Sequence, residues 1–319
     1  MAEVCDAGTN LLLLGDTNDV QLYRELIRRG VAEYLVKPTA PREIFDTVTN
    51  IFVDPDAPPM GQVIAFYGSR GGVGSSTIAQ NVSWQLATEA EEDVVLIDLD
   101  LPFGTTALGF NIEVQQGIQD ALRDPDRLDS VLLERFYHEQ TEKLNLLAST
   151  NSLSGEIRVT TDGLERILEL TRSSATIVVV DVPHIWTPWA RQLLLDADQT
   201  VITMTPDLAS LRDTRSIQDI LKTQRGDHAP IHTVLNKFGA SKKYEFSIGD
   251  VEEALGAGPT TILNYDAALF GEASNNGQML SELHDKHRLV ETMREFVMLL
   301  TGRSSLLKKK RKKMGFFKF

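Results

Sequence analysis

Short apolar runs recur along most of the chain, and stretches long enough for amphipathic helices separate them. The runs lack regular polar alternation, a pattern typical of strands that are buried on both faces of a sheet. Strands that alternate with helices predict an α/β fold, with a mostly parallel, doubly wound sheet and helices on both of its faces. The predicted strands cover residues 62–68, 94–100, 176–183, 199–206 and 231–237, and the predicted helices cover residues 76–90, 208–223 and 280–300.

A shorter βαβα pattern comes before residue 54, and the proline-rich segment DPDAPPMG follows it at 54–61. Two strands and two helices are too few to bury a robust core by themselves. We therefore expect three parts: a partial unit over 1–56, the main α/β domain over 57–302 and a tail over 303–319. Within the first part, the predicted strands cover residues 11–16 and 32–38, and the predicted helices cover residues 19–29 and 41–52.

The segment FYGSRGGVGSST at 66–77 lies between a predicted buried strand and a predicted helix, which is the context of a phosphate-binding loop. Gly71, Gly72 and Gly74 let the backbone approach an anion closely. The N–H groups at the helix start then face the phosphates. A hydroxyl at Ser76 suits Mg²⁺. The alternative is a glycine-rich turn without a ligand, but the strand, the helix and the hydroxyl all favour a phosphate loop.

Polar side chains close three of the predicted strands. Asp98 and Asp100 end one strand, and Asp181 ends another. Carboxyl ends of parallel strands are where ligands bind in such sheets. A single aspartate there is more often a helix cap, but three beside a phosphate loop favour a nucleotide site. Asn236 closes a further strand, and its amide can either bind an adenine edge or form a turn before Lys237.

The motif RGGVGSST at 70–77 resembles the deviant Walker A motif KGGVGK[ST]T of the ParA/MinD ATPases. Arg70 stands where that family has its signature lysine, and Ser75 stands where it has its second lysine. The likeness extends from residue 62 to about residue 300 and is greatest to the CpaE/TadZ branch, which helps to place and assemble tight-adherence (Flp-type) pili. The segments that carry it are DLDLPFGT (98–105), DVPHIWTPWARQLL (181–194), PDLASLRDTRSI (206–217), VLNK (234–237) and FGEASNNGQML (270–280).

This resemblance implies a P-loop domain that binds ATP and Mg²⁺ and forms a nucleotide-dependent homodimer. It implies that Asp100 orients the attacking water and that Arg70 reaches the partner's nucleotide. Ser76, Asp98 and Asp181 are the residues it implies at the metal. The nucleotide-binding residues that we expect are Gly71, Gly72, Val73, Gly74, Ser75, Ser76, Thr77 and Asn236.

The serine at position 75 is the main departure from the family motif. A lysine there places a positive charge on the β- and γ-phosphates, and one charge pair at ~4 Å in partly shielded surroundings is worth on the order of 4 kcal/mol. Mg²⁺, backbone N–H groups and Arg70 replace only part of that. We expect retained ATP binding with weak or slow hydrolysis, and whether ATP is hydrolysed at all stays open.

The segment at 30–48 resembles the last strand and helix of a response-regulator receiver domain, with Lys37 and Pro38 as the characteristic pair. The strands that carry the phosphoacceptor aspartate have no counterpart in the ten residues before the first predicted strand, so we do not expect phosphorelay signalling. A docking or dimer surface is the expected role of this degenerate receiver-like unit.

The net charge of −13 conceals an asymmetry, because residues 308–319 hold six Lys, one Arg and no acid. Without those seven charges the rest carries about −20. A body this acidic argues against specific or general nucleic-acid binding. Basic and aromatic residues together suit an anionic membrane surface. MinD relatives use a C-terminal helix in this way. The alternative is a basic tail that binds any acidic surface.

One cysteine, Cys5, excludes an internal disulfide framework and fits a reducing cytoplasm, and no apolar run approaches the ~18 residues of a membrane span. His184, Trp186 and Trp189 have no nucleophile or metal-ligand spacing beside them, so packing or partner contact is expected.

The leading hypothesis is an ATP-binding localisation and assembly factor for Flp-type pili. It would be cytoplasmic and peripheral at the inner membrane, and it would act with pilus or type IV-like secretion proteins. A MinD/ParA-type ATPase for division-site placement or DNA partitioning is the alternative, and a scaffold without nucleotide is a third.

Overall fold

The computed structural model describes residues 9–39, 43–44, 47–48, 51, 60–150, 158–225, 229–241 and 243–303. The chain divides into two compact units, Met1–Pro59 and Met60–Phe319. The helix predicted over 41–52 falls mostly on residues outside these ranges, as does the tail from 304 onward. Among the described residues, no helix is long and apolar enough to cross a membrane.

The first unit is a small β-α-β element. Strands β1 (Leu12–Gly15) and β2 (Glu33–Val36) pair in parallel, and helix α1 (Val20–Arg28) connects them. Asp19 caps the helix, since its carboxylate accepts a hydrogen bond from the Gln21 backbone N–H at 2.7 Å. No residue of α1 is buried. The two described strands and the helix lie where the apolar pattern predicts them.

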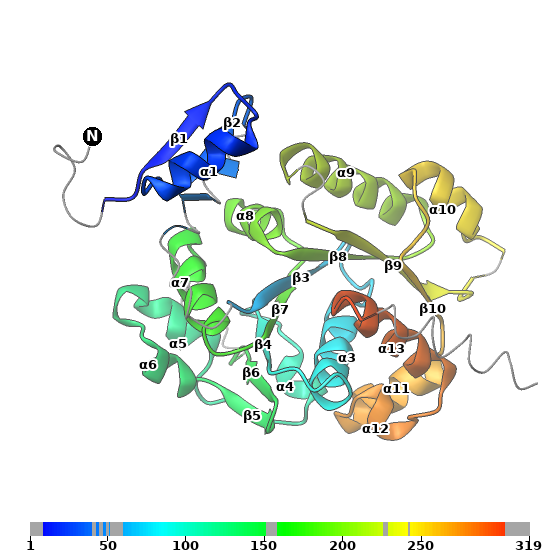
Figure 1. Ribbon diagram of the computed structural model, residues 1–319. Coiled ribbons are helices and arrows are strands. Elements are labelled where there is room, and N and C mark those ends of the chain that lie inside the picture. The colour runs from blue at the N-terminus through cyan, green and yellow to red at the C-terminus, as the bar shows by residue number, and fades with distance from the viewer. Residues whose placement is uncertain are drawn as a thin grey trace, which may run out of the picture. The chain divides into compact units, whose positions relative to one another are not determined.

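The second unit is built on an eight-stranded sheet with the order β10-β9-β8-β3-β7-β4-β6-β5. Every neighbouring pair is parallel except β5 and β6. The predicted mostly parallel sheet is confirmed (Figure 1). The strands are β3 (Gln62–Gly68), β4 (Val94–Asp98), β5 (His138–Thr141), β6 (Leu144–Leu147), β7 (Ile177–Val182), β8 (Gln199–Met204), β9 (Ile231–Phe238) and β10 (Thr261–Asn264).

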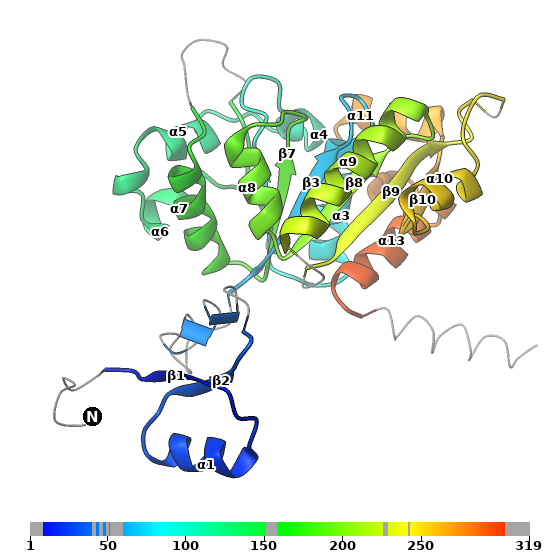
Figure 2. The same ribbon diagram turned by 90° about the horizontal axis from the view of Figure 1, so that it is seen from above.

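Helices cover both faces of this sheet, as Figures 1 and 2 show. On one face lie α3 (Ser75–Thr88), α11 (Ala267–Asn276), α12 (Leu280–Leu283) and α13 (Arg288–Leu300). On the other face lie α5 (Ile118–Arg123), α6 (Ser130–Glu134), α7 (Thr161–Arg172), α8 (Pro188–Asp196), α9 (Leu208–Arg225) and α10 (Ile248–Leu255). Two short elements complete the unit, α4 (Thr106–Gly109) and the 3-10 turn Pro125–Arg127.

Successive residues of each strand pack into opposite cores, because side chains alternate across a sheet. In β3, Ile64 and Phe66 pack in the core that contains α3 and α13, while Val63 and Ala65 pack against α7 and α8. All four are buried. Strands that bury both faces explain why the apolar runs show no polar alternation.

The single helix predicted over 280–300 is wrong, because the chain forms two helices there. Backbone φ at His284 is −139°, which ends α12, and α13 starts at Arg288. His287 caps the second helix, since its Nδ1 accepts a hydrogen bond from the Leu289 N–H at 3.2 Å. A local cap therefore overrides an apolar periodicity that continues through it.

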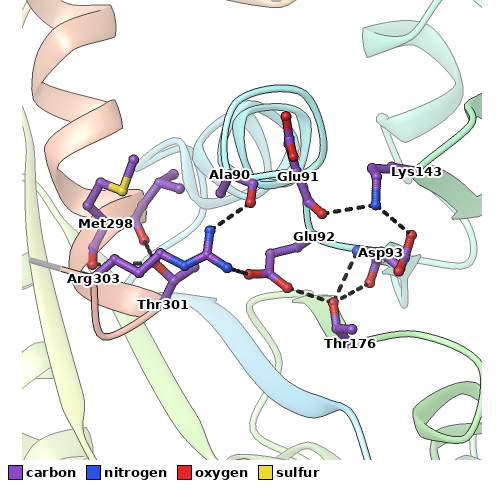
Figure 3. Close-up of polar contacts among 10 residues, drawn as sticks. Ala90, Glu91, Glu92, Asp93, Lys143, Thr176, Met298, Thr301 and Arg303 are labelled. Atoms are coloured by element: carbon purple, nitrogen blue, oxygen red, sulfur yellow. Dashed lines mark hydrogen bonds and ion pairs between the residues drawn. The ribbon is translucent and has the colours of Figure 1, made fainter. Parts of the chain in front are cut away.

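Ion pairs connect several elements at the amino edge of the sheet, where the parallel strands begin (Figure 3). Arg303, just after α13, donates to the Ala90 carbonyl at 2.7 Å and pairs with Glu92. Lys143, just before β6, pairs with Asp93 at 3.2 Å. These contacts join the ends of α3 and α13 to the start of β4.

Candidate nucleotide-binding site

A glycine-rich loop connects the end of β3 to the start of α3 at Ser75. Gly72 and Gly74 have φ of 79° and 94°, in the left-handed region that favours glycine. A Cβ on Gly74 would lie 2.6 Å from Nδ2 of Asn236, so a larger residue does not fit. A Cβ on Gly72 would meet nothing within 4 Å, which leaves that side of the loop open.

The loop borders a cavity of about 920 Å³ at the carboxyl edge of the sheet, where the parallel strands end. The cavity brings together most residues that the sequence predicts for nucleotide binding and catalysis. Those that line it are Arg70, Gly71, Gly72, Val73, Gly74, Ser75, Ser76, Thr77, Asp100 and Asn236. Asp98 and Asp181 are not among its lining residues, because both are buried at the strand ends.

Asp98 and Asp181 lie directly opposite one another at the ends of β4 and β7. Asp98 is fully buried and accepts hydrogen bonds from the N–H groups of Asp100 at 3.0 Å and Thr106 at 3.2 Å. Burial raises the pKa of Asp98 above its usual value. Burial and repulsion from Asp98 raise the pKa of Asp181 to about 8, although a hydrogen bond with the Ser76 side chain acts in the opposite direction.

This acidic pair fits a divalent cation. No Lys or Arg among the described residues forms an ion pair with either carboxylate. Within the described ranges no group of three or more His, Cys, Asp or Glu could hold a metal alone. Mg²⁺, however, commonly takes one or two carboxylates and completes its shell with water and substrate phosphates. Ser76, Asp181 and Asp98 are the residues that would hold it.

Ser75 lies inside the loop with its Oγ buried and without a hydrogen-bond partner. A short neutral side chain therefore occupies the position of the lysine in the family motif. Arg70 is exposed at the rim of the cavity and has no ion-pair partner among the described residues. Its guanidinium is thus available to an anion in the cavity or beside it.

Asn236 braces the loop. Its Nδ2 donates to the Val73 carbonyl at 2.8 Å, and its Oδ1 accepts from the N–H of Lys237 at 2.8 Å. Both atoms of the amide thus have a partner within the chain. Contact with an adenine edge stays a prediction that would draw on the remaining N–H of Nδ2.

Two residues contact the loop although the motifs gave them no such role. His184 Nδ1 lies 2.9 Å from the Gly68 carbonyl, and because a carbonyl only accepts, Nδ1 carries the proton in this contact. Lys237 Nζ donates to the Gly72 carbonyl at 2.7 Å. The only signal in the sequence was their position near the end of a strand, since His184 follows β7 and Lys237 lies in the last part of β9.

Trp189 is buried, whereas Trp186 remains 45% exposed and its ring lies edge-on to Tyr67, with centroids 6.2 Å apart. Burial, together with the negative charge of Asp213, raises the pKa of Tyr67 to about 12. The two tryptophans therefore differ: Trp189 is part of the core and lines the cavity, whereas Trp186 is exposed beside Tyr67.

A glycine loop between a parallel strand and a helix, with a hydroxyl and buried carboxylates beside it, defines the class as a P-loop nucleotide-binding α/β protein. A family model described as an AAA domain matches residues 61–229. The chain therefore belongs to the ParA/MinD family of P-loop ATPases, since this match covers more than half of its length.

Curated relatives agree with this family. The septum site-determining protein MinD of Escherichia coli is 25% identical over 230 residues, which span 69% of this chain and 83% of that protein. A ParA family protein of a Chlamydia psittaci virulence plasmid, pGP5-D, is 24% identical over 170 residues. That match spans 51% of this chain and only 64% of the length of the relative.

Solved structures share the fold. A ParA family ATPase from Chlorobium tepidum superposes with a TM-score of 0.68 at 22% identity, over 74% of this chain and 98% of that one. MinD of Pyrococcus horikoshii, solved with Mg-ADP, superposes with a TM-score of 0.66 at 18% identity, over 76% of this chain and 96% of that one.

Proposed function

We propose that this protein is an ATP- and Mg²⁺-binding switch that dimerises with nucleotide and hydrolyses ATP slowly. One observation carries the proposal: the loop, its hydroxyl and the buried Asp98–Asp181 pair are retained, while Ser75 replaces the lysine of the family motif. The backbone N–H groups and the helix start can hold phosphates without that lysine. The metal, when bound, would neutralise charge between the phosphates and the carboxylates.

Hydrolysis should be slow because Ser75 replaces a lysine. The ammonium of that lysine would stabilise the negative charge that develops on the phosphates during the reaction. Asp100 remains beside the cavity to orient a water, and Arg70 remains at its rim. A test is ATP turnover by the purified full chain, with Ser75→Lys alongside. The lysine variant should turn over ATP at least about tenfold faster. Ser75→Ala is the matched control, since it changes the same position without adding charge, and it should behave as wild type. Equal turnover by wild type and Ser75→Lys would contradict the proposal.

Several features support a face-to-face homodimer on the cavity side. Phe103, Ile185 and Tyr265 line the cavity and are 69%, 43% and 50% exposed. Exposed aromatic and aliphatic groups around a charged site resemble the anchors of protein interfaces. Light scattering should detect a dimer with Mg-ATP and a monomer without nucleotide. Arg70→Ala should weaken the dimer if Arg70 acts across the interface, and unchanged dimerisation would refute that role.

The biological role that we propose is localisation and assembly of tight-adherence pili. It is supported by the likeness of segments 98–105, 181–194 and 270–280 to the CpaE/TadZ branch. MinD-like division-site placement is the second candidate, and the MinD relatives favour it. Deleting the gene separates them: loss of surface pili with normal cell length supports the first, and misplaced septa with normal pili support the second.

Attachment to the inner-membrane face through residues 303–319 completes the proposal. Apart from Arg303, the tail lies beyond the described residues, so its composition is the support: seven basic residues and three phenylalanines within 308–319. Sedimentation with anionic liposomes should carry the full chain and leave a chain that ends at Leu307 in solution. Equal sedimentation of both would refute membrane attachment, and retained binding to an acidic protein would then favour the alternative.

The N-terminal unit is proposed as a docking surface. Val20, Tyr23 and Ile27 of α1 are 62%, 38% and 37% exposed, and their spacing places them on one side of the helix. A chain without residues 1–56 should fold and bind ATP but lose its cellular position. Unchanged localisation and self-association would argue against this role.

A further inference from the structure

Lys237 has a backbone conformation that residues with side chains rarely adopt. Its φ is 56°, in the left-handed region. The pairing of β9 with β10 shifts at the same place, since Leu235 pairs with Ile262 but Phe238 pairs with Asn264. Strand β9 thus has one more residue than β10 over this step, which is a β-bulge.

The bulge changes the direction of a side chain. Val234 packs in the core that contains α3, while Leu235 packs in the opposite core with α10. Regular alternation would place Asn236 on the α3 side and Lys237 on the α10 side. Bulges re-aim side chains in this way, and they are frequent next to functional sites.

Asn236 stays on the side that regular alternation gives it, and the Lys237 side chain also contacts the glycine loop. Asn236 Nδ2 donates to the Val73 carbonyl at 2.8 Å, and Lys237 Nζ donates to the Gly72 carbonyl at 2.7 Å. Two consecutive residues of one strand therefore hold two consecutive carbonyls of the loop. The strained backbone at Lys237 persists because these contacts fix it.

This contact of Lys237 lies at the wall of the cavity, where a ligand would bind. Lys237 lines the cavity, and its ammonium has three donors, of which Gly72 accepts one. Ser75 contributes no charge to the loop, so among the described residues Lys237 and Arg70 are the two Lys or Arg side chains on the cavity wall.

The strand order decides which part of a nucleotide this cation would meet. Strand β9 lies on one side of β3, whereas β7 and β4, with Asp181 and Asp98, lie on the other. A metal held by the carboxylates and Ser76 would place the terminal phosphate beside them. The ribose and the inner phosphate would then lie on the side of Lys237.

We infer that the Asn236–Lys237 bulge is a clasp that holds the loop in its phosphate-binding shape, with Lys237 as a positioning residue for the inner half of the nucleotide. The inference deepens the proposed ATP site and rests on it. Because the clasp acts away from the terminal phosphate, it stabilises bound ADP and ATP equally. Ser75→Lys, in contrast, should favour ATP over ADP.

The test is calorimetry with ADP and with ATP, in Mg²⁺, on the full chain and on Lys237→Gly. Glycine tolerates positive φ, so the variant should melt no lower than wild type without nucleotide. Its affinity for both nucleotides should fall about tenfold, as expected for losing one charged hydrogen bond. Lys237→Asn, which also tolerates this backbone, should behave in the same way, and Lys237→Arg should stay within about threefold of wild type.

Glu91→Gly is the matched control. Glu91 has φ of 59° and lies at the opposite edge of the sheet, so the substitution relieves similar strain without touching the loop. It should leave both affinities unchanged. Wild-type affinity in Lys237→Gly, or a loss confined to ATP, would overturn the clasp alone. Absence of binding by the wild-type chain would instead overturn the proposed function, and the clasp with it.

Discussion

The central sheet has an amino edge, where its parallel strands begin, and a carboxyl edge, where they end. The acidic residues at these two edges differ in how their charge is balanced. At the amino edge, Glu92 and Asp93 are paired with Arg303 and Lys143 (Figure 3). At the carboxyl edge, Asp98 and Asp181 are buried side by side, and no described cation pairs with them. The carboxylates at the first edge are paired within the chain, whereas the two at the second edge have no cation beside them among the described residues.

This contrast shows where the folded chain keeps electrostatically unfavourable contacts. Partly exposed ion pairs such as Arg303 with Glu92 contribute modestly to stability and hold the ends of helices together. Burial raises the pKa of both carboxyl groups, and repulsion from Asp98 raises that of Asp181 further. Perturbed groups of this kind gather at functional sites, because the cost disappears when the ligand binds.

Removing a carboxylate at the carboxyl edge should have the largest effect on ATP affinity. Asp181→Asn removes a metal-binding carboxylate, so ATP affinity in Mg²⁺ should fall by at least about tenfold and match the wild-type value in EDTA. Isothermal titration with and without Mg²⁺ measures both values. A Mg²⁺-dependent affinity that survives in Asp181→Asn would remove Asp181 from the metal site.

The same substitution should stabilise the protein without ligand, and increasingly so as pH rises. The unfolded carboxyl of Asp181 loses its proton near pH 4, whereas the folded one keeps it until about pH 8. Between these values the folded state binds more protons, so wild-type stability falls with rising pH. The amide that Asp181→Asn introduces does not titrate, so the variant lacks this dependence.

Asp181→Asn should therefore melt close to wild type at pH 5 and about 5 °C higher at pH 9. Calorimetric melting across this range checks the trend. A difference between the two proteins that stays constant with pH would mean that the pKa of the Asp181 carboxyl is not raised.

The smallest effect should come from the amino edge. Glu92→Gln removes one half of a pair with Arg303, and the side chains of these residues are 16% and 43% exposed. Solvent screening limits the loss to about 1 kcal/mol or less, so Tm should fall by roughly 2 °C. ATP affinity should not change. A fall in affinity as large as that of Asp181→Asn would show that the two edges are not independent.

Much of the site could be predicted from the sequence, because its parts are local. The run from Gln62 to Gly68, the glycines after it and the helix that follows adjoin one another in the chain. The opposed carboxylates were also predictable, since strands of a parallel sheet end at a common edge.

Other features could not be predicted, because they arise from tertiary contacts. The bulge at Lys237 depends on how β9 pairs with β10, and the His184 contact depends on where β7 lies beside β3. The break between α12 and α13 depends on a histidine cap that apolar periodicity does not reveal. The short polar strand β5 is the outermost strand of the sheet on one side, and its sequence gives no apolar signal.

Calorimetric titration of the full chain with ATP and Mg²⁺ at pH 8, with Gly74→Ala as the paired variant, decides whether the loop holds a nucleotide. We predict saturable binding of one nucleotide per chain, with a dissociation constant below about 1 mM. Gly74→Ala should abolish it, because the new Cβ would clash with Asn236 at a left-handed position. Absence of binding by the wild-type chain, or equal binding by the variant, would contradict the claim that the loop holds a nucleotide.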